Sequence, residues 1–216
     1  MIRKLIALTA LLIAASSFSP AMADSSAGMF TGCLTTADAS GPGVGYFGGF
    51  VGFGDHVATV YGTFTYGMAE YTDIRFKLGF SDPDAPQSDP RIMLGFDFKY
   101  ELMDYEDTLH KNPFDLAAGA FIEYADFEFS PLLQLGGDLI GSIPYRFKSG
   151  QKIVPYARLN VRMERVDPDG HDANTDFEAG LNFGAKFELT QDFNLYGEFQ
   201  IDGNTGIYLG MDIRAF

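Results

Sequence analysis

The residues whose types and spacing best suit chemistry form an acidic loop late in the chain. Oxygen-bearing side chains stand at nearly alternate positions in this loop: Asp167, Asp169, Asp172, Asn174 and Asp176. Hard cations such as Ca²⁺ take carboxylate and amide oxygens as ligands, so the loop is a candidate Ca²⁺ site. It does not follow the EF-hand pattern, because Gly170 comes too early and no closing Glu or flanking helices appear. The alternative is a solvated loop in which Asp and Gly only set turns.

A second combination of residues could support nucleophilic catalysis. His56 and His171 lie in expected connections on one side of the chain's strands, together with Ser81, Ser88 and several Asp residues. A Ser/His/Asp set of this kind can activate a serine hydroxyl in a hydrolase or acyltransferase. No motif spacing supports the combination, and His110 lies elsewhere. We therefore predict no catalytic residues and no enzymatic activity, and interpret the histidines as solvated loop residues.

Composition excludes several other functions. The net charge of −14 disfavours nucleic-acid binding, which needs Lys and Arg to contact phosphates. We find no phosphate-cradling loop, no Cys/His metal cluster and no basic patch. The single cysteine, Cys33, cannot form an internal disulfide. Apart from the possible Ca²⁺ in the acidic loop, the sequence suggests no cofactor.

The chain opens with a pattern typical of a secretory signal peptide. Arg3 and Lys4 precede the apolar run from Leu5 to Ala15, and an Ala-x-Ala site ends at Ala23. The run of 11 residues is shorter than the roughly 20 that a membrane-spanning helix needs. We predict cleavage after Ala23, with residues 1–23 as the signal peptide. Residues 24–43 are rich in Ser, Thr, Ala and Gly without a period, which favours a flexible segment.

From residue 44 to residue 216 the apolar residues recur with a period of two, which is typical of β-strands. Eight segments alternate clearly: 73–80, 91–100, 114–124, 133–147, 155–164, 177–188, 193–201 and 207–214. Two weaker ones, 44–53 and 58–66, precede them. The prediction is therefore an all-β, antiparallel, up-and-down barrel of ten strands, or of eight if the first two are miscounted. Both numbers are even, as in single-chain bacterial membrane barrels.

Alternation alone does not show which face of the sheet is inside. A soluble, lipocalin-like periplasmic barrel would hold its apolar side chains around an apolar ligand. The sequence favours the inverted arrangement, because aromatic residues cluster at the ends of the apolar faces, as Phe114 and Tyr124 do. The opposite faces carry both charge signs at mid-strand, as at Lys77, Asp97 and Arg158. In so narrow a barrel these side chains would fill the lumen, leaving little open bore.

The last strand, which closes on Phe216, and the Gly- and aromatic-rich residues 45–54 resemble the corresponding segments of small Gram-negative outer-membrane barrels of the OmpA/OmpX/OmpW kind. The last strand, residues 206–216, ends on Phe216 like the C-terminal assembly signal of those proteins, and residues 45–54 are Gly- and aromatic-rich like their first strand. Phe216 is in phase with the polar set of its strand, so a bulge is needed to turn it outward. Connections containing 81–90 and 167–176 are long and 148–151 and 190–192 are tight, matching the loop asymmetry of these barrels, except for the long connection 103–113.

The resemblance implies export through the periplasm, assembly by the outer-membrane insertion machinery, and contact with outer-membrane lipid and lipopolysaccharide. It implies no single activity, because one fold serves many functions. We expect a structural or surface role, or porin-like but slow passage of small solutes. The alternatives are the soluble periplasmic barrel and a lipid A-modifying enzyme, as some small barrels of this location are. The sequence does not indicate an oligomeric state.

Overall fold

A computed structural model describes residues 35–54, 57–83, 90–106, 112–126, 131–167, 172–201 and 205–216. The predicted signal peptide at residues 1–23 and the first part of the predicted flexible segment lie outside these residues. Eleven strands were identified: β1 Gly45–Gly54, β2 Val57–Ala69, β3 Thr72–Pro83, β4 Arg91–Met103, β5 Asp115–Ala125, β6 Leu132–Ser142, β7 Tyr145–Arg146, β8 Lys152–Val166, β9 Asn174–Glu188, β10 Phe193–Ile201 and β11 Gly206–Arg214.

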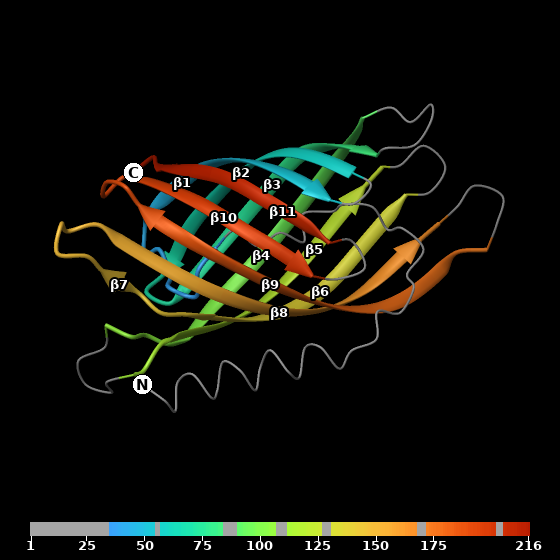
Figure 1. The fold of residues 1–216 in the computed structure, drawn as a ribbon. Coiled ribbons are helices and arrows are strands. Elements are labelled where there is room, and N and C mark those ends of the chain that lie inside the picture. Colours follow the sequence, from blue (N-terminus) through green and yellow to red (C-terminus); the bar gives the residue numbers. More distant parts are fainter. Residues whose placement is uncertain are drawn as a thin grey trace.

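Ten of these strands close into a single antiparallel barrel (Figure 1). Neighbours in sequence are neighbours in the sheet from β1 to β6 and from β8 to β11. The barrel closes where β1 pairs with β11 and where β6 pairs with β8. The ten-strand prediction is therefore confirmed, including the two weaker segments at the start. No helix in the described part of the chain is long and apolar enough to cross a membrane.

The predicted strand over 133–147 is shorter in the structure than in the sequence pattern. The ladder of β6 with β8 ends at Ser142, and Ile143 and Pro144 interrupt it before β7 pairs briefly with β8. Proline has no backbone N–H to donate, so it cannot continue a ladder in which that donor is needed. The two-residue β7 extends one hairpin beyond the barrel wall and is not one of its ten strands.

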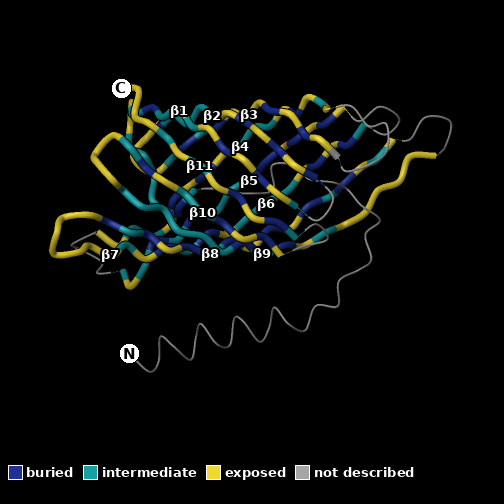
Figure 2. Tube along the Cα trace, turned by 45° about the horizontal axis from the view of Figure 1, so that its top comes forward, coloured by how far each residue is buried: buried dark blue, intermediate teal, exposed yellow. Residues whose placement is uncertain are grey.

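Burial alternates along the strands (Figure 2), and more of the buried positions carry polar or charged side chains than apolar ones. Lys77, Arg158 and Glu198 are 2–3% exposed, whereas Leu78 and Leu209 are more than half exposed. A soluble barrel with an apolar core would show the opposite assignment. The lipocalin-like alternative is therefore wrong for the interior, and the inverted arrangement is confirmed.

Both the start of β1 and the end of β11 lie at one end of the barrel, which we call the terminal end. Tyr46 pairs with Arg214 there, and the backbone N–H of Gly45 donates to the carbonyl of Phe216 at 3.1 Å. The ring of Phe216 lies on the outer face, with its centroid 6.3 Å from Phe64. The expected outward position is reached because β11 ends at Arg214, after which the chain is no longer bound to the alternation of the strand.

The opposite end, which we call the distal end, holds the end of β3 with the start of β4, the end of β5 with the start of β6, and the end of β8 with the start of β9. The strands that flank the two long acidic connections, which were predicted to share a side of the barrel, therefore end at this side. The long connection between Met103 and Asp115 lies instead at the terminal end, together with the turns around residues 70–71 and 189–192.

Candidate functional site in the barrel interior

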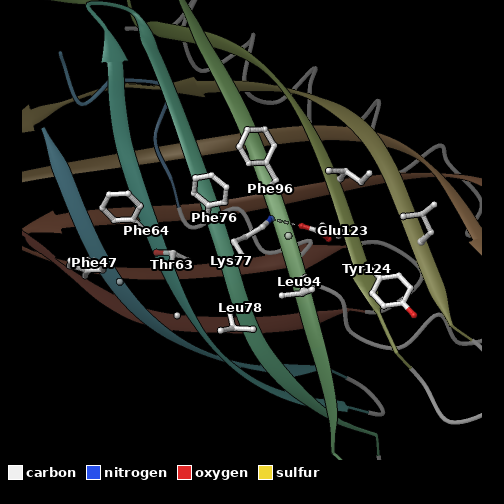
Figure 3. Close-up of a pocket in the computed structure, with 15 residues that line it drawn as sticks. Phe47, Thr63, Phe64, Phe76, Lys77, Leu78, Leu94, Phe96, Glu123 and Tyr124 are labelled. Carbon is white, nitrogen blue, oxygen red and sulfur yellow. Dashed lines mark hydrogen bonds and ion pairs between the residues drawn. The ribbon is translucent and has the colours of Figure 1, made fainter. Parts of the chain in front are cut away.

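The middle of the barrel interior is occupied by ion pairs between neighbouring strands. Lys77 on β3 contacts Asp97 on β4 at 2.8 Å and also pairs with Glu123 on β5 (Figure 3). The Lys77 side chain is 1% exposed and that of Glu123 is fully buried. Arg75 adds a second cation, with Nε donating to Asp97 at 2.7 Å. Buried charges are tolerated only when they are paired, so these contacts must form together as the barrel closes.

A second network fills the opposite part of the wall. Arg162 contacts Glu164 at 2.5 Å, and Gln134 on β6 donates to the same carboxylate at 2.7 Å. Further round the barrel, Asn182 and Tyr156 both donate to Glu198, at 2.7 and 2.6 Å. Side chains from β6, β8, β9 and β10 are thus linked across the lumen surface, which restricts the room for a water-filled channel.

Toward the distal end, apolar side chains meet across the bore. One cluster contains Phe50, Tyr61, Met93, Ala125, Leu132 and Tyr208, with Val166 and Tyr196 packed against it. Phe50 lies on β1 and Leu132 on β6, and these strands stand on opposite walls of the barrel. Because one cluster joins opposite walls, it obstructs the lumen. We call it the apolar cluster.

Glycines in neighbouring strands give the large inner rings their space. A Cβ on Gly210 would stand 1.9 Å from Cδ1 of Phe50, its partner in the ladder. Similarly, a Cβ on Gly184 would stand 2.3 Å from the ring of Tyr156, which is the residue opposite it in β8. The inward-facing glycines therefore allow aromatic rings to lie flat against the wall and fill the interior.

The terminal end is crossed by residues 35–43, here called the N-terminal segment (Figure 1, blue). The backbone N–H of Ala37 donates to Ser142 at 3.2 Å, that of Ala39 to Glu101 at 2.8 Å, and that of Ser40 to Asp73 at 3.1 Å. These acceptors belong to β6, β4 and β3, so the segment spans the mouth. The prediction of a flexible segment over 24–43 thus differs from the structure for residues 35–43.

Lys99 on β4 fixes the same segment through its ammonium group. Its Nζ donates to the carbonyls of Thr36 at 2.9 Å and Asp38 at 2.7 Å, and contacts Asp73 at 3.0 Å. Ala37 is fully buried and packs with Ala117 and Ile140. The segment has no period in its sequence because it is held by its backbone groups, which carry no residue-specific signal.

A polar cavity of about 190 Å³ remains between the N-terminal segment and the apolar cluster. Asp38, Ser40 and Lys99 line it from one side, and Phe50 and Tyr196 line it from the other. Lys186 also lines it, and pairs with Glu188 at 3.0 Å. The residual space is therefore bounded at both ends, and its charged groups have partners within the wall.

A larger hollow, of about 720 Å³, lies against outward-facing side chains of β1 to β6 (Figure 3). Phe64, Phe76 and Phe96 form a row across β2, β3 and β4, because they are successive partners in the ladder. Gly62 has no side chain to fill the space beside Leu78, its partner in β3. Most of the lining residues are apolar and face outward, but Thr63, Lys77 and Glu123 of the inner face also line this hollow, and Thr63 lines the polar cavity as well.

The predicted Ca²⁺ loop lies at the distal end, outside the lumen. Asp167, Asp172, Asn174 and Asp176 are all exposed, and Asp169 lies outside the described residues. Asn174 donates to Asp176 at 2.6 Å, and Arg165 lies 3.8 Å from Asp167. The Ca²⁺ prediction for this loop stays a prediction.

The residues considered for catalysis are mostly beyond the described part of the chain. His56, His110, His171 and Ser88 all lie outside it. Ser81 is described; it is fully buried near the distal end of β3. A buried hydroxyl of this kind does not by itself form a nucleophilic site.

Sequence reasoning missed a cluster of acidic residues at the terminal end. Glu101, Asp104 and Asp115 each offer a carboxylate oxygen, and these atoms lie within 4.8 Å of one another. Glu101 ends the inward-facing row of β4 and Asp115 begins β5, with Asp104 in the connection between them. The unusual length of that connection on the side of the tight turns was the available signal.

Several solved β-barrels are similar in fold to this chain. A barrel from the de novo design of transmembrane β-barrels is 13% identical and covers 82% of this chain and 99% of its own, with a TM-score of 0.38. The N-terminal β-barrel domain of Pseudomonas aeruginosa OprF is 10% identical, and the match covers 81% of this chain and 99% of that domain with a TM-score of 0.38. The β domain of the Bordetella autotransporter BrkA is 10% identical, and the match covers 79% of this chain and 98% of that domain with a TM-score of 0.44.

No protein family and no curated protein sequence matches the chain. At such identities and scores the similarities say nothing of activity or partners. The class of the molecule follows from its own strand pairing, which defines a closed, ten-stranded, antiparallel up-and-down β-barrel with a polar interior.

Proposed function

We propose that the protein is a small β-barrel of the bacterial outer membrane with a largely filled lumen, serving a structural or surface role or slow passage of small solutes. The observation that carries this proposal is the inverted distribution of side chains. Large apolar residues such as Leu94, Leu135 and Leu159 are about half exposed, while charged residues are buried. A soluble monomer rarely exposes a contiguous apolar patch above a few hundred Å².

A bilayer accounts for this surface better than water does. Strands of 9–15 residues are long enough to cross hydrocarbon, since a tilted transmembrane strand needs about 9–11. The closed sheet satisfies the backbone groups that hydrocarbon cannot. The partners implied are outer-membrane lipid and lipopolysaccharide, with the insertion machinery acting during assembly. The acidic loop at residues 167–176 would then face outward as a possible Ca²⁺ site.

The lumen is obstructed twice, which supports a closed barrel over an open pore. The N-terminal segment crosses the terminal end, and the apolar cluster joins opposite walls toward the distal end. Ion pairs such as Lys77–Asp97 occupy much of the interior between the two obstructions, where the polar cavity remains. We propose no enzymatic activity, because the described residues of the interior bring no nucleophile and base together beside a substrate-sized opening.

Membrane residence is tested by fractionation and by heating. The proposal predicts that the protein sediments with the outer membrane and migrates differently on a gel with and without boiling. A mature protein that stays soluble without detergent would contradict the proposal. The lipid A-modifying alternative is tested separately by replacing His56 and His171 with Ala, which should leave the lipid A mass spectrum unchanged.

Closure of the lumen is tested by bilayer conductance of detergent-refolded protein. The wild type should give no stable conductance steps. A variant lacking residues 35–40 and a Phe50→Ala/Tyr208→Ala variant should each stay closed, because one obstruction remains in each. Combining the two changes should give the largest conductance of the three variants, limited by the ion pairs that remain between the two positions. Large steps in the wild type would contradict the filled lumen.

A further inference from the structure

Among the described residues, no Lys or Arg side chain neutralises the acidic cluster at the terminal end. Glu101, Asp104 and Asp115 approach within 4.8 Å of one another, and no described Lys or Arg forms an ion pair with any of them. Lys99 is the nearest candidate on β4, but its three N–H groups already serve Thr36, Asp38 and Asp73.

Glu101 provides a second, independent observation at this position. The residue is only 6% exposed, and its Oε2 accepts the N–H of Ala39 at 2.8 Å. Its Oε1 is buried and has no hydrogen-bond partner among the described residues. Burying a carboxylate oxygen without a hydrogen-bond donor costs free energy, and a cation beside Oε1 would offset that cost.

We propose that Glu101, Asp104 and Asp115 bind a hard divalent cation of the Ca²⁺ class. The donor set consists only of carboxylate oxygens, which such ions prefer. Ca²⁺ binds oxygen at about 2.3–2.6 Å, so two of its ligands stand at most roughly 4.6–5.2 Å apart. The 4.8 Å limit of the cluster fits that span. Ca²⁺ also tolerates the irregular geometry that a strand end, a connection and a second strand provide.

The position of the cluster gives the cation a structural role in closing the barrel. Ala39 of the N-terminal segment donates directly to Glu101. Ala37 donates to Ser142, whose hydroxyl donates to Asp115 at 3.3 Å. A cation held here would fix the acceptors on which the segment docks. This role rests on the proposed closed lumen, whereas the binding itself does not.

Binding is tested by calorimetric titration of Ca²⁺ into refolded, chelator-treated protein. All variants carry Asp172→Asn and Asp176→Asn, so that the distal loop cannot contribute. We expect one Ca²⁺ per barrel, weakened at least about tenfold by Glu101→Gln and by Asp104→Asn. Glu106→Gln is the matched control in the same connection and should leave affinity unchanged, since Glu106 pairs with Arg146 outside the cluster.

Each outcome of the titration is informative. Asp104 is partly exposed and outside the strands, so its variant tests binding even where Glu101→Gln impairs folding. The proposal is overturned if the titration shows no heat of binding up to about 10 mM Ca²⁺, a concentration beyond the Kd range of weak extracellular sites. The carboxylates would then be neutralised by protons instead. Equal affinity in the Asp104 variant would also overturn it.

The failure of this proposal is distinguishable from failure of the proposed function. A barrel that binds Ca²⁺ through the cluster yet conducts freely would keep the site and contradict the closed lumen. A barrel that stays closed yet binds no Ca²⁺ would do the reverse.

Discussion

Replacing Lys77 with Met removes the central cation of the interior while keeping a side chain of similar length. Glu123 would then have no ion-pair or hydrogen-bond partner among the described residues, since Lys77 is the partner that it has. Asp97 would keep Arg75. Breaking a fully buried pair on one side costs about 3–5 kcal/mol, and the complete burial of Glu123 places this change within that range.

A second variant distinguishes the effect of breaking the Lys77–Glu123 ion pair from the effect of lost side-chain packing. In the double variant Lys77→Met/Glu123→Met both charges are gone, and the unfolding free energy should return to within about 1 kcal/mol of the wild type, because apolar replacement of a buried pair is often neutral. Arg146 and Glu106 provide the matched control, since their 3.0 Å pair is more than half exposed. Arg146→Met should cost less than about 1 kcal/mol.

The assay is reversible urea unfolding of the protein in lipid vesicles, followed by far-ultraviolet circular dichroism because the chain has no Trp. A Lys77→Met cost below about 1 kcal/mol, equal to that of the exposed pair, would refute the reasoning. It would mean that water reaches Glu123 and that the lumen is open at this height.

Two further predictions concern the inner rings and the distal loop. Gly210→Val should lower the free energy of unfolding by about 1–3 kcal/mol, because its side chain displaces the ring of Phe50. Gly49→Val is the control and should cost far less, because a Cβ at Gly49 meets nothing within 4 Å. Equal effects of the two variants in the same urea assay would argue against the packed interior. The distal loop is tested in the Glu101→Gln variant, in which any remaining Ca²⁺ binding with a millimolar Kd is expected to come from the loop and should be lost when Asp172→Asn and Asp176→Asn are added. If the Glu101→Gln variant binds no Ca²⁺ at all, the loop is only a solvated turn.

The period of two predicted nearly all of the barrel wall, because each strand has one face in an apolar and one in a polar environment. The placement of Lys77 inside and Leu78 outside follows directly from that alternation. The boundary of β6 was less predictable. Local alternation continues through Tyr145 and Phe147, and only Pro144 signals that the ladder stops.

The contents of the lumen could not be predicted in the same way. Residues 35–43 dock through backbone N–H groups, which every residue except proline has, so their sequence does not encode the acceptors. The acidic cluster joins Glu101 and Asp115 across a connection, and its geometry depends on how β4 and β5 end. Contacts between strand ends arise from barrel closure, which a pattern along the chain does not describe.

The central claim is that the apolar face of the barrel lies in lipid, and Leu78→Arg tests it most directly. Leu78 is 57% exposed in the middle of β3, so in water the change would alter the unfolding free energy by no more than about 0.5 kcal/mol. In a bilayer it should cost about 2–4 kcal/mol. Leu189→Arg, in the turn beyond β9, is the control and should cost about 0–1 kcal/mol in either environment. A measured cost of 2 kcal/mol or more for Leu78→Arg alone is the predicted result, and equal, negligible costs for both variants would contradict the account.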